Sequence, residues 1–208
     1  NARVASSKLR AEDSRIAEYL EAIEFSSKNL VRTIDVILRS RDVDNASLAL
    51  EMEPLHMGIR IEEAIERLAP LCRAQAQILN FRANKSLVVN ANGECLELVV
   101  YHIIEQALRS SASEEIIALE LSTRAQTARF SVKAKGGRER ATNLRKLLKR
   151  SISGAEELKQ RASVNFSLIA SVKLIEAMGG NFSISQRADG ISFNLSLQLS
   201  RQGSLFES

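Results

Sequence analysis

Hydrophobic and polar residues follow their clearest pattern near the C-terminal end of the chain, between Val164 and Leu199. Apolar residues recur there first at steps of three and four, as on one face of a helix that is expected to end at Gly179. Two runs of alternating apolar and polar residues follow, and Asp189 with Gly190 between them is typical of a hairpin turn. This segment is therefore predicted to form a helix and a two-stranded hairpin.

The N-terminal stretch from Leu9 to about Arg41 has a longer apolar pattern. Its apolar residues fall on alternating steps of three and four over about four heptads. A single helix cannot bury such a stripe by itself. We predict a long helix that joins a dimerising bundle or coiled coil, the alternative being a helix that packs against its own domain.

Between these ends the pattern changes several times. Residues 42–58, which include Pro54, are expected to form a linker or a short extended segment. Helices are expected at 59–77, where Pro70 predicts a kink or an early end, at 96–109, and at 138–150; strands are expected at 78–82, 87–89, 115–123 and 127–133, and a mobile stretch at 151–163. This order predicts an α+β fold, with a dimerisation helix in residues 1–45 and a layered domain in residues 55–200.

Composition narrows the class of protein. The 208 residues, 45% of them hydrophobic, fit one ordinary domain with a smaller unit, and the N-terminal Asn suggests a fragment of a longer polypeptide. No apolar run is long enough to span a membrane, and the N-terminus lacks the apolar region of a signal peptide. Cys72 and Cys95 are expected to be packing residues in a reducing, cytoplasmic setting. The net charge of +4 does not by itself indicate nucleic-acid binding.

Three passages, taken in order, resemble a bacterial histidine kinase core. Residues 19–40 are similar to the second helix of its dimerisation and phosphotransfer hairpin. Residues 101–111, YHIIEQALRSS, are similar to the N-box helix of its ATPase domain, and residues 167–180 with the following hairpin resemble the segment of its second glycine box. The resemblance implies a two-layer α/β sandwich, a homodimer, and a response regulator receiver domain or a partner kinase as the binding partner.

The N-box positions depart from the family's pattern. Its asparagines help to hold the magnesium ion of bound ATP, and His102 and Gln106 stand at those positions. Magnesium prefers oxygen ligands, so His102 is a poor substitute. Glu105 and Arg109 retain the acidic and basic positions of the box.

Both glycine boxes depart from the pattern as well. In the first, Ala134 stands where an aspartate binds adenine, Gly136 keeps a glycine, and Arg138 replaces another. In the second, Asn165-Phe166-Ser167 replaces the glycines at the start of a helix, where backbone N–H groups bind phosphate. The substitutions predict a degenerate pocket without a cofactor. The alternative is a working kinase fragment that binds Mg-ATP and whose phosphoacceptor helix lies outside this chain.

The histidines offer no phosphoacceptor. His56 and His102 are the two histidines of the chain, and neither lies in a sequence that resembles the phosphoacceptor motif. His56 is interpreted as a linker residue and His102 as a structural one. We predict neither a catalytic residue nor a metal site.

The predicted helix at 138–150 is strongly basic. It carries Arg138, Arg140, Arg145, Lys146, Lys149 and Arg150. These cations suggest a solvated face, a docking surface for an acidic partner such as a receiver domain, or a nucleic-acid site, which the lack of stacking aromatics disfavours. The favoured function is a non-catalytic dimeric scaffold or regulator in two-component signalling. An active kinase fragment and a nucleic-acid-associated regulator remain the alternatives.

Overall fold

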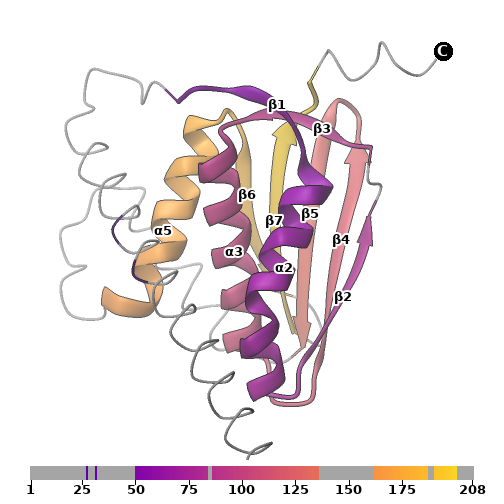
Figure 1. Ribbon diagram of the computed structural model, residues 1–208, viewed down its shortest axis with the longest axis vertical. Helices are drawn as coiled ribbons and strands as arrows, with labels where there is room; N and C mark the ends of the chain where they lie inside the picture. The colour runs from indigo at the N-terminus through magenta and orange to yellow at the C-terminus, as the bar shows by residue number, and fades with distance from the viewer. Residues whose placement is uncertain are drawn as a thin grey trace, which may run out of the picture.

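The computed structural model describes residues 27, 31, 50–83, 86–135, 162–186 and 190–200, and Figure 1 shows a layer of helices packed against a sheet. The elements run in the order β1 Glu53–His56, α2 Met57–Ala74, β2 Ile78–Ala83, β3 Val88–Ala91, α3 Gly93–Ser110, β4 Ile116–Arg124, β5 Thr127–Lys135, α5 Ala162–Ala177, β6 Asn181–Gln186 and β7 Gly190–Gln198. Each helix and strand expected between residues 59 and 133, and the helix and hairpin after residue 164, is confirmed with small shifts of its ends.

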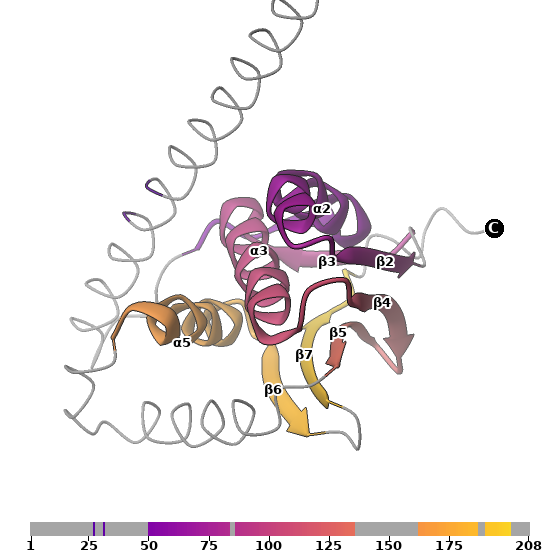
Figure 2. The same cartoon turned by 90° about the horizontal axis from the view of Figure 1, so that it is seen from below.

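The main sheet has five strands in the order β2-β4-β5-β7-β6. β2 runs parallel to β4, and the other neighbours pair antiparallel. A second, two-stranded sheet joins β1 to β3. Figure 2 shows α2, α3 and α5 side by side on one face of the main sheet. The predicted two-layer α+β sandwich is therefore confirmed.

The segment around α2 differs in detail from the expectation. Part of the expected linker is the strand β1, which confirms its extended form. Pro70 lies inside α2, and the helix continues to Ala74, so the early end predicted at this residue is wrong. Leu68 and Cys72, on either side of Pro70, are buried against the core. Their packing offsets the hydrogen bond that proline cannot donate.

The helix α3 is the centre of the helical layer. It begins after Asn92, whose side-chain oxygen accepts a hydrogen bond from the Cys95 backbone N–H at 3.0 Å. Ile103 and Ile104 are consecutive residues and both are fully buried, so more than one face of α3 packs into the core. Such burial is expected of a helix with neighbours on both sides, and α3 packs against α2, α5 and the sheet.

The two glycines after α5 fix how the helix turns into β6. Gly179 has a φ of +71°, and the Gly180 N–H donates to the Ile175 carbonyl oxygen at 2.8 Å. A Cβ atom at Gly180 would lie 2.6 Å from the backbone oxygen of Ser196, which is closer than atoms can approach.

The Gly180→Ala variant is therefore expected to lose about 1–3 kcal/mol of unfolding free energy, because backbone must move to admit the methyl group. Urea unfolding measures this loss. Gly93→Ala is the matched control, since a Cβ there meets its nearest atom at 3.4 Å, and the free energy should stay level or rise. Equal losses in the two variants would contradict the steric explanation.

Several predicted segments lie outside the described residues. These are the N-terminal helix, of which only Ser27 and Val31 are described and are helical, the basic helix at 138–150, and the stretch 151–161. The domain limits 1–45 and 55–200 accordingly stay predictions. Among the described helices, none combines the length and the apolar character needed to cross a membrane.

Candidate functional site

The first N-box position, His102, lies where α3 meets α5. Its side chain is 6% exposed, and its Nδ1 lies 3.3 Å from the Ser171 hydroxyl oxygen on α5. That hydroxyl donates to the Ser167 carbonyl oxygen at 2.8 Å. Because a serine hydroxyl has a single proton, the His102 Nδ1–H must be the donor to Ser171. His102 thus fastens α3 to α5 through a short hydrogen-bonded chain.

Burial keeps the His102 imidazole neutral. It lowers the pKa of His102 to about 4, because the charged ring would lose its hydration. The neighbouring Tyr101 ring lies edge-on at 5.8 Å between ring centroids, and burial raises the pKa of Tyr101 to about 12. With Nδ1 engaged by Ser171, His102 has the environment of a structural residue that joins two helices.

The other N-box residues lie on two sides of α3. Gln106 is buried at 9% exposure, and its Nε2 donates to the Ser110 hydroxyl within the same helix at 3.4 Å. Glu105 and Arg109 form an ion pair of 2.9 Å nearer the surface. A pair of this kind, one helical turn apart, contributes only a few tenths of a kcal/mol, about 0.3–0.5. The N-box residues therefore lie on two faces of α3, with Gln106 buried and the Glu105–Arg109 pair nearer solvent.

The glycine-box positions are described in part. Ala134 lies near the end of β5, is 4% exposed, and pairs with Ile191 of β7. It shares the side of the strand with Phe130 and Val132, which belong to the core. A methyl group there has no hydrogen bond to offer a purine. Ser167 lies on α5 with its carbonyl engaged by Ser171.

The remaining site predictions fall outside the described residues or side chains. They are Gly136, Arg138, Asn165, Arg140, Arg145, Lys146, Lys149 and Arg150. Within the described part of the chain, no three His, Cys, Asp or Glu side chains gather closely enough to hold a metal ion. Cys72 and Cys95 are free thiols, and burial raises the pKa of Cys72.

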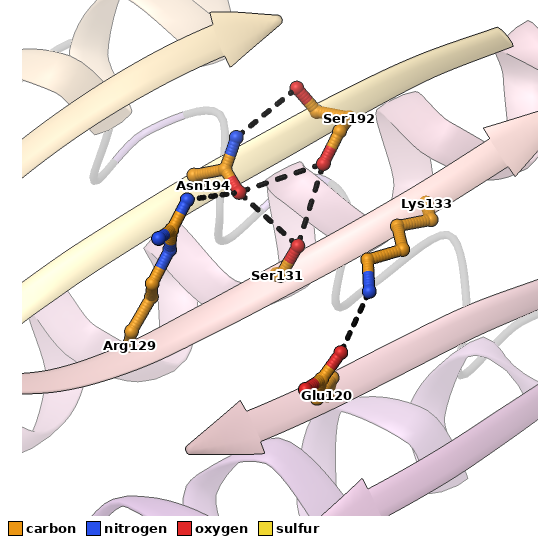
Figure 3. A network of polar contacts seen from close by, with 6 residues as sticks. All are labelled: Glu120, Arg129, Ser131, Lys133, Ser192 and Asn194. Atoms are coloured by element: carbon orange, nitrogen blue, oxygen red, sulfur yellow. Dashed lines mark hydrogen bonds and ion pairs between the residues drawn. The ribbon is translucent and has the colours of Figure 1, made fainter. Parts of the chain in front are cut away.

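A polar network on the sheet face away from the helices was missed by sequence reasoning (Figure 3). Asn194 of β7 accepts at Oδ1 from Ser131 at 3.1 Å, from Arg129 at 3.3 Å and from Ser192 at 3.5 Å. Alternation identified this face of β7 as polar. The convergence on Asn194 required the register that sets Ser131 directly opposite it, which no local pattern contains.

Lys133 and Glu120 form an ion pair of 2.6 Å beside this network, between β5 and β4. The Lys133 ammonium lowers the pKa of Glu120 through a hydrogen bond and through its charge. Both side chains are exposed, so solvent screens the pair and its contribution to stability is small.

Comparison with known proteins places the fold among histidine kinases. No protein-family model matches the chain. A curated relative, the sensor protein GacS of Pseudomonas syringae pv. syringae, is 26% identical over 190 residues, which are 88% of this chain and 21% of the relative. This chain thus spans about a fifth of the length of that protein.

Solved structures agree with the sequence comparison. The catalytic domain of histidine kinase ThkA in a nucleotide-free form is 18% identical with a TM-score of 0.61, over 74% of this chain and 99% of that one. Full-length ShkA in complex with AMPPNP is 17% identical with a TM-score of 0.61, over 88% of this chain and 38% of that one. The mycobacterial sensor histidine kinase MprB is 14% identical with a TM-score of 0.59, over 71% and 97%. The resemblance to a histidine kinase core is confirmed, and the fold is that of its catalytic domain.

Proposed function

We propose that this chain is the core of a two-component signalling protein that acts through protein contacts and does not turn over ATP. The observation that carries the proposal is the state of His102. It occupies a magnesium-holding position of the family, yet it is buried, neutral and hydrogen-bonded to Ser171. Gln106, at the second such position, pairs with Ser110 of its own helix.

The expected loss of nucleotide affinity is large. A hydrogen bond lost to adenine at Ala134 leaves the purine amino group unpaired, at about 1–3 kcal/mol. A weakened magnesium site adds to this loss. Two such losses of about 1.4 kcal/mol each reduce affinity roughly a hundredfold.

Calorimetric titration with Mg-ATP tests the proposal. We expect no saturable heat of binding up to about 1 mM nucleotide. A dissociation constant of about 1 mM corresponds to a binding free energy of only about 4 kcal/mol. The double variant His102→Asn with Gln106→Asn restores the two asparagines of the family's box, with a shorter stem at position 106, and should gain affinity at least about tenfold. Gln75→Asn, in the turn after α2, is the control and should gain nothing. Micromolar binding by the unaltered protein would overturn the proposal.

The dimer and its partner extend the same proposal. A homodimer would form through residues 1–45, whose heptad pattern needs a second helix. The basic helix at 138–150 would contact an acidic receiver domain or a partner kinase. A cytoplasmic location is part of the proposal, because the two cysteines of the chain fit a reducing setting.

An active kinase fragment is the second candidate, favoured by the retained Glu105 and Arg109 pair and by the likeness to a sensor protein of which the matched part is 21%. Transfer of labelled phosphate in a longer form of the protein would separate the two candidates. The nucleic-acid alternative rests on the basic helix alone and stays a prediction.

A further inference from the structure

A shallow apolar groove lies beside the first residues of β2, where α2 ends. Its volume is about 460 Å³, and its walls are formed by Ile65, Ala69, Cys72, Arg73, Ala76, Gln77, Ile78 and Leu79. Most of these side chains are aliphatic. The groove is large enough for one bulky side chain or a short peptide segment.

Gln77 lies at the base of this groove and holds its wall in place. Its side chain is 5% exposed, and its Nε2 donates to the Leu108 carbonyl oxygen at 3.0 Å and to the Ala112 carbonyl oxygen at 2.9 Å. Among the described residues its Oε1 accepts no hydrogen bond. A buried acceptor without a donor is unfavourable by about 1–3 kcal/mol, but this oxygen lies beneath the surface of the groove, so the groove offers an occupant mainly apolar contact.

The groove adjoins a free strand edge. β2 is the terminal strand of the main sheet, and in the described part of the chain no strand pairs with its outer edge (Figure 1). The Ile78 N–H donates toward β4, to the Glu115 carbonyl oxygen at 3.1 Å. Backbone groups alternate along a strand, so the N–H and C=O groups of Leu79 and Phe81 point to the open edge.

Exposed apolar side chains also lie at this edge of the sheet. Ile78 and Ile116 are direct cross-strand partners on the sheet face away from the helices, and they are 57% and 52% exposed. A strand added beyond β2 would continue this row and cover Ile78. Arg73 and Arg82 lie near the two ends of this edge, and both are exposed. Natural edge strands are usually shielded from pairing, so an apolar open edge indicates a binding surface.

We propose that the β2 edge binds an extended segment of a partner protein by strand addition. The segment pairs its backbone with Leu79 and Phe81 and inserts one apolar side chain into the groove. Acidic residues at its ends match Arg73 and Arg82. This surface is separate from the α3–α5 contact at His102, so the inference stands whether or not the protein binds nucleotide.

A designed peptide tests the proposal on the full chain. The probe is acetyl-Asp-Val-Thr-Val-Thr-Val-Asp-amide, which favours an extended form, and the readout is amide chemical shifts and hydrogen exchange. We expect binding with shifts centred on Ala76, Leu79 and Phe81, and slower exchange at the Leu79 and Phe81 amides. The same peptide N-methylated at alternate residues cannot pair as a strand and should not bind.

Two variants on α2 distinguish peptide binding in the groove from nonspecific hydrophobic binding. Ala69→Trp fills the groove and should weaken peptide binding at least about tenfold, which is 1.4 kcal/mol. Ile59→Trp adds the same side chain at an exposed position near the start of α2 and should change binding less than about twofold. Circular dichroism confirms that each variant is folded.

Three results would overturn the proposal. One is the absence of peptide binding at a peptide concentration of about 1 mM, which would mean that the binding free energy is weaker than about 4 kcal/mol. Another is equal binding by the N-methylated peptide or by the Ala69→Trp variant. The third is protection of the Leu79 and Phe81 amides that rises with protein concentration without peptide, which would assign this edge to a second copy of the chain.

Discussion

Lowering the pH from 7 to below 4 is expected to reduce the unfolding free energy by about 3 kcal/mol through His102 alone. The unfolded histidine has a pKa of 6.5, and burial lowers the folded value to about 4. The unfolded chain therefore takes up a proton first, as the pH falls below about 6.5, and the folded protein does so only near pH 4. Each pKa unit is about 1.4 kcal/mol, so the loss grows between these pH values and is complete below pH 4.

Urea unfolding at several pH values, compared between the unaltered protein and His102→Gln, isolates this contribution. The variant removes the titrating group, so its stability should fall less steeply between pH 6.5 and 4 even if the variant is less stable at pH 7. His56→Gln is the matched control, because it makes the same replacement at an exposed histidine. Identical slopes for His102→Gln and the unaltered protein would show that the pKa of His102 is the same in the folded and unfolded states.

Replacing Phe130 by alanine is expected to lower the unfolding free energy by about 3–5 kcal/mol. Phe130 is fully buried at the middle of β5, opposite Leu121 of β4 and Leu195 of β7. Removing its ring loses apolar burial and leaves a cavity between the sheet and the helical layer, which can close only in part because the backbone ladders fix the strands. Typical domains have only about 5–15 kcal/mol of stability, so the loss is a large part of the total.

Phe182→Ala provides the matched control for Phe130→Ala. Phe182 lies opposite the same Leu195, but on the edge strand β6, and it is only half-buried. Its loss should be clearly smaller, because solvent already reaches part of the ring. Denaturant midpoints at an unchanged slope measure both values. A loss at Phe182 as large as that at Phe130 would mean that the edge of the sheet carries as much of the packing as its centre.

The sequence was a good guide to elements whose pattern is local. The apolar period of α3 is kept in the structure because its neighbours bury its apolar positions. The alternation of β7 separates an apolar face from a polar face, but Ser192 and Asn194 on the polar face are buried too. The early end suggested by Pro70 is absent because packing of α2 outweighs the lost hydrogen bond, while the alternative of a kink stays a prediction. The pairing of β1 with β3 was not foreseen, since strands of four residues carry too little pattern to identify a partner.

The candidate site was predictable as a set of positions but not as a set of contacts. The N-box positions follow from the spacing of residues along α3, so His102 and Gln106 could be identified without a structure. The contact between His102 and Ser171 joins residues 69 apart in sequence. It depends on how α5 lies against α3, which only the packed core determines. The same limit applies to the convergence of donors on Asn194.

Entry to and exit from the described domain occur at the same end. β1 pairs with β3, Val89 of β3 forms a bridge with Leu199, and the Ser200 N–H donates to the Val88 carbonyl oxygen at 2.8 Å (Figure 1). β1 and the Leu199–Ser200 segment, which are the two ends of the described domain, are therefore both joined to β3. A force applied at either end of the described domain would act first on the two-stranded sheet of β1 and β3. This sheet would carry the tension before it reached the α3–α5 contact.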